Sequence, residues 1–128
     1  MNDSARDFTP HERAVLDFLV RDSVPDAAVL REQIAVARFV KPWFERSSSF
    51  DFVVADSAPR MIGTGPLVEA GASVYADAED RCDTSYVGEI FLWKEDGLAN
   101  SLEFSWVTDE MPDALPSISH LQHHEDRK

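Results

Sequence analysis

The first part of the chain places its apolar side chains at helical spacing in two successive segments. In the first, "TPHERAVLDFLVRD", apolar positions recur every three or four residues and form one stripe. Thr9 followed by Glu12 forms a capping box, and Pro10 occupies the first helical position, where a missing N–H is tolerated. We therefore predict a helix over residues 10–21.

The second segment, "SVPDAAVLREQIAVARFVKPWF", repeats the helical spacing. Ser23 or Asp26 is placed to cap its N-terminus. Pro42 has no N–H and disfavours helical backbone in the residue before it, so we expect this helix to end near Val40. Because few residues join the two segments, an antiparallel helical hairpin is expected.

The pattern changes to the period-two alternation of strands after the three consecutive serines at 47–49. "FDFVVAD" at residues 50–56 and "ASVYADA" at residues 72–78 are predicted strands. The intervening "SAPRMIGTGPLVEAG" is rich in proline and glycine and has weak periodicity, so we predict a loop there.

The later stretch "GEIFLWKEDGLANSLEFSWVTDEMPD" has the pattern of a β-hairpin. Two alternating apolar segments stand on either side of a Glu-Asp-Gly turn. Residues 86–94 are expected to pair with residues 101–108, and Gly97 and Asn100 supply positions of positive φ in the connection.

Alternation along this hairpin predicts two different sheet faces. If Leu102, Phe104 and Trp106 face the helices, the outer face is a mixed surface of aromatic rings and carboxylates, which suits a binding surface. Its members would be Glu89, Phe91, Trp93 and Glu103 from the hairpin, with Asp51, Tyr75 and Asp77 from other strands. Two other arrangements stay open: the rings lie under a loop, or the first arm is a central strand buried on both faces.

These elements predict an α+β fold, with an N-terminal antiparallel helix pair packed on an antiparallel sheet of about four strands. At 128 residues and 44% hydrophobic residues, the chain has the size and composition of a single domain with one core. We assign residues 1–116 to that domain. Residues 117–128 are polar, and we expect them to form a flexible C-terminal tail.

The features that bear on location indicate the cytoplasm. No apolar window is long enough to span a membrane, and the charged start "MNDSARDFTPHER" is unlike a secretory signal. With Cys82 as the one cysteine, an internal disulfide is excluded and a reducing compartment is expected. Neighbouring carboxylates disfavour a thiolate, so Cys82 is expected to be an inert surface thiol.

The net charge of -12 is concentrated in the middle of the chain. Residues 77–113 contain 11 acidic and 2 basic side chains. A field of this sign repels phosphate backbones and anionic lipid surfaces, so binding to nucleic acid or to a membrane is disfavoured, whereas a basic protein would be attracted. Solubility is an alternative reason for the excess of acid.

No catalytic or cofactor-binding motif occurs in the sequence. It has no G-x-S-x-G, no G-x-G-x-x-G and no Walker sequence, and "GTGP" at residues 63–66 is too short for a phosphate loop, so we predict no cofactor. One cluster has the residue types of a metal site: His120, His123, His124 and Glu125. Because this segment has no helical stripe, we predict a solvated tail and no metal site.

Three stretches together resemble a family of small bacterial proteins of unknown function: "TPHERAVLDFLVRD", "LREQIAVARFV" and "VGEIFLWKEDGLANSLEFSWVTDEMPDALP". The family's late strand pair and its D/E-x-x-P motif are matched by Gly88, Asp96, Gly97, Leu102, Glu103, Asp109 and Pro112. The resemblance covers most of the chain except the loop at 56–72 and the tail. It implies no known enzyme, and by analogy small acidic proteins of this type are similar to immunity proteins, which bind and block a toxin.

Charge and the lack of a catalytic motif together predict a non-catalytic protein-binding module, immunity-like by analogy, that acts on a basic protein. The predicted partner-binding residues are Glu89, Phe91, Trp93 and Glu103, with Asp109 and Glu110 at the edge. The alternative is a small-ligand-binding protein or enzyme with a carboxylate-lined pocket between helices and sheet, using the acids near Asp109 and Glu110. Formation of a homodimer through the aromatic outer face is also left open.

Overall fold

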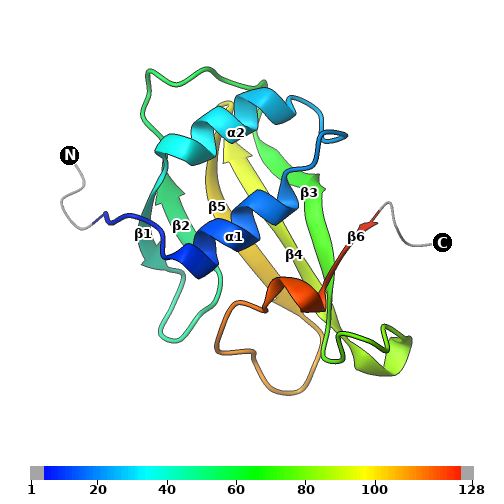
Figure 1. Cartoon of the computed structure of the whole chain (residues 1–128). Coiled ribbons are helices and arrows are strands. Elements are labelled where there is room, and N and C mark those ends of the chain that lie inside the picture. The colour runs from blue at the N-terminus through cyan, green and yellow to red at the C-terminus, as the bar shows by residue number, and fades with distance from the viewer. Residues whose placement is uncertain (1–4, 125–128) are drawn as a thin grey trace.

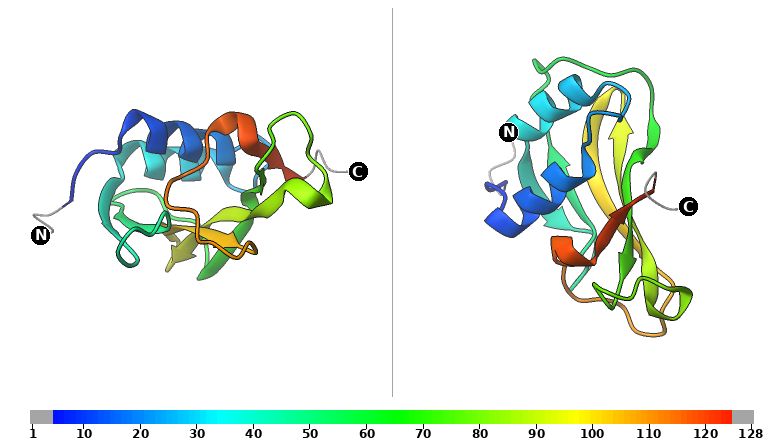
Figure 2. Two further views of the ribbon diagram at one scale, coloured as in Figure 1. Left: turned by 90° about the horizontal axis from the view of Figure 1, so that it is seen from below. Right: turned by 45° about the vertical axis from the view of Figure 1, so that its right-hand side comes forward.

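Two helices cover one face of a six-stranded antiparallel sheet in the computed structural model, which describes residues 5–124 (Figures 1 and 2). The α+β class and the N-terminal position of the helices are as predicted. The number of strands is not: the described chain forms six rather than about four. Two short strands that the sequence pattern does not reveal, β1 and β6, lie at the two edges of the sheet.

Helix α1 (Pro10–Leu19) begins at the predicted capping box. The Thr9 hydroxyl accepts the amide N–H of Glu12 at 3.1 Å, and the Glu12 carboxylate accepts the amide N–H of Thr9 at 2.8 Å. The helix ends two residues before the predicted boundary, because Val20 already has extended backbone with a ψ of 90°.

Helix α2 (Ala27–Val36) follows Asp26, which takes a left-handed φ of 59°. The prediction that this helix continues to near Val40 is wrong, because Arg38–Pro42 forms the edge strand β1. Aromatic and β-branched residues suit a strand, and pairing with β2 outweighs the helical spacing of these few residues. Pro42 is tolerated because an edge strand has one side without ladder partners.

The remaining strands build a sheet in the order β1-β2-β5-β4-β3-β6. They are β2 (Phe50–Val53), β3 (Gly65–Tyr75), β4 (Tyr86–Glu95), β5 (Leu98–Trp106) and β6 (Leu121–His123), with the 3₁₀ turns η1 (Asp83–Ser85) and η2 (Ile118–His120) before β4 and β6. The predicted hairpin, β4 and β5, therefore lies at the centre of the sheet.

The turn of the central hairpin is tighter than predicted. Asp96 and Gly97 have φ values of 52° and 80°, which is the pattern of a two-residue type I′ turn. Gly97 thus has the expected positive φ, but Asn100 does not and lies inside β5. The ladder skips Asn100, since Trp93 pairs with Ser101 and the next residue pairs with Ala99, so Asn100 is a bulge residue.

Half of the predicted loop at residues 57–71 belongs to β3, which starts at Gly65. The register of β3 against β4 shifts between Leu67 and Gly71, so three residues bulge out of the ladder. This bulge interrupts the period-two alternation, and for that reason the sequence shows a regular pattern only in the second part of the strand.

The predicted flexible tail is corrected over residues 117–124. This segment forms η2 and β6, and β6 pairs with β3 through Leu121, Gln122 and His123. Leu121 is 2% exposed and belongs to the core. The remaining residues of the predicted tail, 125–128, lie outside the described residues.

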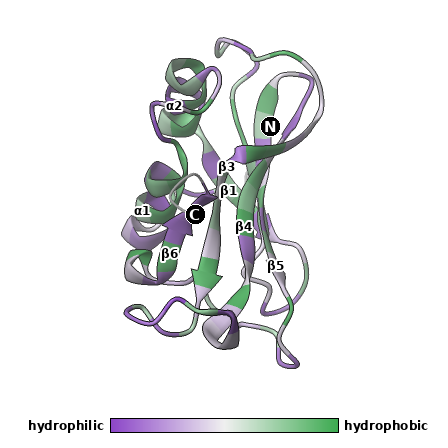
Figure 3. Cartoon of the chain, turned by 90° about the vertical axis from the view of Figure 1, so that its right-hand side faces the viewer, coloured by the Kyte–Doolittle hydropathy of each residue, from purple (hydrophilic) through white to green (hydrophobic). Residues whose placement is uncertain are grey.

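The core fills the layer between the helices and one face of the sheet. The most deeply buried side chains of the hairpin alternate along β4 and β5 and point to this layer: Ile90, Leu92, Leu102 and Phe104. Figure 3 shows both helices on the same side of the sheet. Among residues 5–124 no helix covers the opposite side, which we call the open sheet face.

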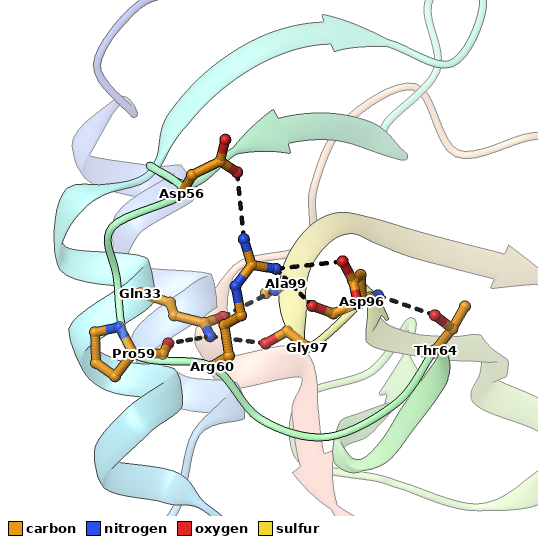
Figure 4. A network of polar contacts seen from close by, with 8 residues as sticks. All are labelled: Gln33, Asp56, Pro59, Arg60, Thr64, Asp96, Gly97 and Ala99. Atoms are coloured by element: carbon orange, nitrogen blue, oxygen red, sulfur yellow. Dashed lines mark hydrogen bonds and ion pairs between the residues drawn. The ribbon is translucent and has the colours of Figure 1, made fainter.

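A buried glutamine connects α2 to the central hairpin (Figure 4). The Gln33 amide donates to the carbonyl oxygens of Pro59 at 2.8 Å and Gly97 at 2.9 Å, and it accepts the Ala99 amide N–H at 2.8 Å. The Gln33 side chain thereby binds three backbone groups, and one of them, the amide N–H of the buried Ala99, would otherwise lack a partner.

The tip of the hairpin is also held by the loop before β3 (Figure 4). Arg60 donates to the carbonyl oxygen of Asp96 at 2.7 Å, and the amide of Asp96 donates to the Thr64 hydroxyl at 2.9 Å. The hairpin turn is therefore covered by the loop before β3. The accessible surface of β4 and β5 is the open sheet face.

Candidate functional site

Predicted site residues lie on the open sheet face, as the alternation indicates. Glu89, Phe91 and Trp93 alternate along β4 with buried residues, and Glu103 lies opposite Phe91 on β5. All four side chains are half-buried. β4 is a central strand, but only one of its faces is fully buried, so the arrangement with burial on both faces is excluded.

The first pair on this face joins an indole to a carboxylate. Trp93 donates its indole N–H to Glu103 Oε1 at 2.9 Å, and its ring packs against Phe91 with centroids 5.9 Å apart. A charge-assisted hydrogen bond of this kind fixes both side chains. Trp93 and Glu103 therefore present a defined surface in which an aromatic ring and a negative charge are adjacent.

A second pair of the same type comes from a residue that sequence reasoning missed. Trp43, directly after β1, donates its indole N–H to Asp51 Oδ1 at 3.0 Å and is itself 41% exposed. Asp51 pairs with Ser101 in the ladder and faces the open side, as predicted. The expectation of a helix up to Val40 concealed the strand that positions Trp43, although the chain's three tryptophans were a usable signal.

Trp43 lines two shallow hollows on this face. One, of about 190 Å³, extends toward Trp93 and Lys94. The other, of about 330 Å³, extends toward Glu103 and Trp106. Trp43 and Trp93 therefore line the smaller hollow, and Trp43 lines the larger one together with Trp106, which packs against the core at the end of β5. Each hollow contains aromatic surface beside polar side chains.

Glu89 has a different environment from Glu103. Its Oε2 accepts the Ser73 hydroxyl at 2.9 Å and the Tyr86 hydroxyl, and its Oε1 contacts His124 Nε2. The side chain is 26% exposed. Both oxygens of Glu89 are therefore engaged in joining β4 to β3 and to the residue after β6, so its first role is structural.

Two further residues predicted for the outer face contribute no exposed side chain to the strands there. Tyr75 is only 6% exposed and packs edge-on against Tyr86 at 5.7 Å. Asp77 follows the end of β3 and accepts the amide N–H groups of Glu79 at 2.9 Å and Asp80 at 3.1 Å. These hydrogen bonds lower the pKa of the Asp77 carboxyl. The register of β3 against β4 shifts between Val74 and Tyr75, and the strand ends at Tyr75, so the alternation does not extend to Asp77.

Asp109 and Glu110 lie in the exposed connection that follows β5. The best-defined hollows of residues 5–124 have other residues in their walls, and neither acid contributes to them. The structure therefore brings Phe91, Trp93 and Glu103 together but does not place these two acids in the same cluster.

The histidines of the predicted metal-type cluster have three separate environments. His120 Nδ1 lies 2.8 Å from the carbonyl oxygen of Tyr75, His123 stacks on Phe18 at 4.0 Å, and His124 contacts Glu89. Within residues 5–124, no group of three or more His, Cys, Asp and Glu side chains is placed to hold a metal ion. Glu125 lies outside the described residues.

Comparison with known proteins gives no assignment: no family model matches the chain, and neither curated proteins nor solved structures give a match. In the described part of the chain, no helix has the length and apolar character needed to cross a membrane.

Proposed function

We propose that this chain is a non-catalytic protein-binding module whose open sheet face receives a basic protein. One observation supports this proposal above the others: two indole-carboxylate pairs, Trp43–Asp51 and Trp93–Glu103, lie on the accessible face of a sheet whose other face is the core. Rigid aromatic rings beside carboxylates are suited to bind cationic side chains through both ring faces and charge.

The internal hydrogen bonds of these pairs favour binding because they reduce the freedom that a partner would otherwise have to restrict. Trp93 and Trp43 are each held by an acceptor within the same face. A surface that is already ordered loses less side-chain entropy on association. The two tryptophan side chains are therefore ordered before a partner binds.

Charge distribution supports a basic partner over other partners. Residues 77–113, which contain β4 and β5, hold 11 acidic and 2 basic side chains. Such a field accelerates association with a basic protein and disfavours nucleic acid and anionic lipid. An immunity-like role against a basic toxin of bacteria and a cytoplasmic location belong to the same proposal. The location rests on the single cysteine, Cys82, which is free and exposed.

The test is affinity capture from the native cell extract at low salt, followed by kinetics with the purified partner. Wild type should retain a basic protein that the double variant Trp93→Ala, Glu103→Lys loses. In the kinetic step, Glu103→Gln should weaken the affinity by about tenfold, since the loss of a buried charge contact is worth on the order of 1.4 kcal/mol or more. The association rate should fall as salt rises.

The matched control is Glu32→Gln. Glu32 is exposed on α2, on the opposite side of the sheet, and its replacement changes the net charge by the same amount. If the two variants bind equally, net charge alone governs association and the open sheet face is not the binding surface. Binding that ignores salt and Glu103→Gln would refute the proposal, as would a homodimer formed through this face.

A second candidate function is small-ligand binding in a hollow of about 220 Å³ between the α1–α2 connection and the sheet. Its walls include Arg21, Glu69 and His124, so positive, negative and imidazole groups meet in one place. This hollow differs from the predicted alternative, because Glu69 is the one carboxylate residue in its walls and neither Asp109 nor Glu110 contributes to it. A ligand screen by thermal shift, in which His124→Ala abolishes any stabilisation, would distinguish it from the protein-binding function.

A further inference from the structure

We infer that the larger hollow beside Trp43 is a subsite for one guanidinium group, supplied by an arginine side chain of the basic partner. This inference rests on the proposed function and specifies its chemistry. We name it the Trp106 hollow, and its walls are Trp43, Phe44, Ser49, Glu103, Phe104, Ser105 and Trp106.

The hollow lies where the pairing between β2 and β5 ends. β2 pairs with β5 only through Phe50 and Asp51, so β5 from Glu103 to Trp106 has no strand neighbour on that side. The connection between β1 and β2 lies there instead, and Ser49 anchors it by accepting the Phe104 amide N–H at 2.8 Å. The space is thus part of the architecture of the sheet.

Aromatic surface is unusually accessible around this space. Trp43 is 41% and Phe44 48% exposed, and both lie on the short connection after β1. Trp106, at the end of β5, is half-buried against the core. Four aromatic residues from two segments that are far apart in sequence therefore line one hollow, and the exposed rings are those of Trp43 and Phe44. Exposed aromatic faces beside a carboxylate suit an organic cation.

One carboxylate gives the hollow its sign. Glu103 Oε1 accepts the Trp93 indole N–H, whereas Oε2 makes no hydrogen bond or ion pair with the residues that the structure describes. No basic side chain lines this hollow, while Lys94 lines the smaller one beside it. A cation is therefore favoured here, and a purely apolar occupant is disfavoured because it would remove Glu103 Oε2 from water without supplying a donor.

A guanidinium group matches these walls better than an ammonium group. It is planar, it is weakly hydrated, and it stacks on aromatic faces while its edge N–H groups donate to a carboxylate. An ammonium group holds its water more strongly, and it offers no flat face to the exposed rings of Trp43 and Phe44. The aromatic lining and the charge of the hollow thus favour arginine over lysine.

The test uses N-acetyl-L-arginine amide as the probe and the neutral, nearly isosteric N-acetyl-L-citrulline amide as its control. The three indole N–H signals in a ¹H–¹⁵N correlation spectrum report the three tryptophans separately, once assigned through Trp→Phe variants. The arginine probe should move the Trp43 and Trp106 signals in a saturable way with millimolar affinity. The citrulline probe should bind about tenfold more weakly, since it lacks the cation.

Two variants identify the site. Phe44→Ala alters an exposed wall of the hollow away from the core, and Glu103→Gln removes its charge; each should weaken arginine binding about tenfold. Glu32→Gln should leave binding unchanged, and well-dispersed spectra of all three variants establish that the fold is intact. Equal shifts with arginine and citrulline, or indole signals that move only with protein concentration because a second copy covers the hollow, would overturn the inference.

The experiments distinguish failure of the guanidinium subsite from failure of the proposed protein-binding function. A partner whose binding depends on Trp93→Ala and Glu103→Gln but ignores Phe44→Ala would keep the protein-binding function and refute the subsite. Saturable arginine binding at Trp43 and Trp106, with no basic protein captured, would establish the subsite chemistry and refute the proposed function.

Discussion

Trp93 and Glu103 are diagonal neighbours on the central hairpin, and the indole of one donates to the carboxylate of the other at 2.9 Å. Diagonal neighbours on an antiparallel pair are within reach of long side chains, so the register of β4 and β5 determines this contact. The orientation of the aromatic surface on the open sheet face is therefore linked to the stability of the hairpin beneath it.

This link gives a first prediction. Glu103→Ala should lower the free energy of unfolding by about 1 kcal/mol and speed solvent exchange of the Trp93 indole N–H, because the partly buried donor loses its acceptor. Glu103→Gln retains an oxygen acceptor and should lose less. Urea unfolding and exchange spectroscopy measure the two effects, and identical behaviour of the two variants would show that the hydrogen bond does not hold Trp93.

Gln33→Leu should lower the free energy of unfolding by about 2 kcal/mol. Leucine fills the buried volume but leaves the buried Ala99 amide without its partner, and an unsatisfied buried group costs on the order of 1–3 kcal/mol. Chemical denaturation measures the loss. Glu32→Leu, at the exposed neighbouring position of α2, is the control and should change stability by less than about 0.5 kcal/mol.

Gly97→Ala should be markedly more destabilising than Gly63→Ala. Both glycines have positive φ, 80° and 89° respectively, so both substitutions introduce left-handed strain of about 1 kcal/mol. A Cβ at Gly97 would also lie 2.2 Å from the carbonyl oxygen of Met61, whereas nothing lies within 4 Å of a Cβ at Gly63. Thermal unfolding measures the loss of stability in each variant: Gly63→Ala reports backbone strain alone, and Gly97→Ala reports strain together with the steric clash. Equal losses of stability would show that the Met61 carbonyl does not crowd Gly97.

Acidification should weaken the attachment of the N-terminal segment to α1. Burial acts to raise the pKa of the Glu12 carboxyl, but hydrogen bonds from Arg6 and Thr9 outweigh it, so its pKa lies below the ordinary value. A carboxyl with a lowered folded-state pKa contributes stability above its unfolded pKa, and that contribution is lost as pH falls through the folded pKa.

The pH dependence is tested by comparing wild type with Glu12→Gln in urea unfolding at a series of pH values. The stability difference between the two proteins should be largest near neutral pH and should shrink below the usual titration range of a glutamate. Glu32→Gln serves as the exposed control. A difference that stays constant down to the acid transition would exclude Glu12 as the titrating group.

His124→Ala should loosen β6 without unfolding the domain. His124 contacts Glu89, which also binds Ser73 and Tyr86, so its removal takes away the side-chain tie at the end of a three-residue strand. Hydrogen exchange at the amides of β6 should accelerate relative to that of β4. Gln122→Ala, at a neighbouring position of β6, is the matched control and should leave exchange in β6 close to that of wild type.

Local patterns predicted the parts of the fold that depend on neighbours in sequence. The capping box at Thr9 and the alternation of Phe91 and Trp93 with buried residues were sufficient to place α1 and the open sheet face. These features are determined by residues three or two positions apart, and their physical causes act within a single helix turn or strand. They are therefore visible in one sequence.

Features that depend on distant pairing were not predictable in this way. β1 has few residues and overlaps a helical pattern, and β6 consists of three residues in a polar segment; each becomes a strand only because another strand is available beside it. For the same reason the Trp43–Asp51 pair and the contact of His124 with Glu89, 35 residues away, remained hidden. The separate positions of Asp109 and Glu110 follow from a connection whose path no local pattern specifies.

The position of β5 between β2 and β4 has a consequence during synthesis. β2 ends at Val53, but the strand that covers its inner edge begins only at Leu98. While the ribosome adds the intervening residues, the first hairpin has an unpaired edge and the aromatic side chains of Phe50 and Phe52 have no neighbouring strand on that side. Nascent chains that stall before β5 should therefore be prone to aggregate or to recruit chaperones.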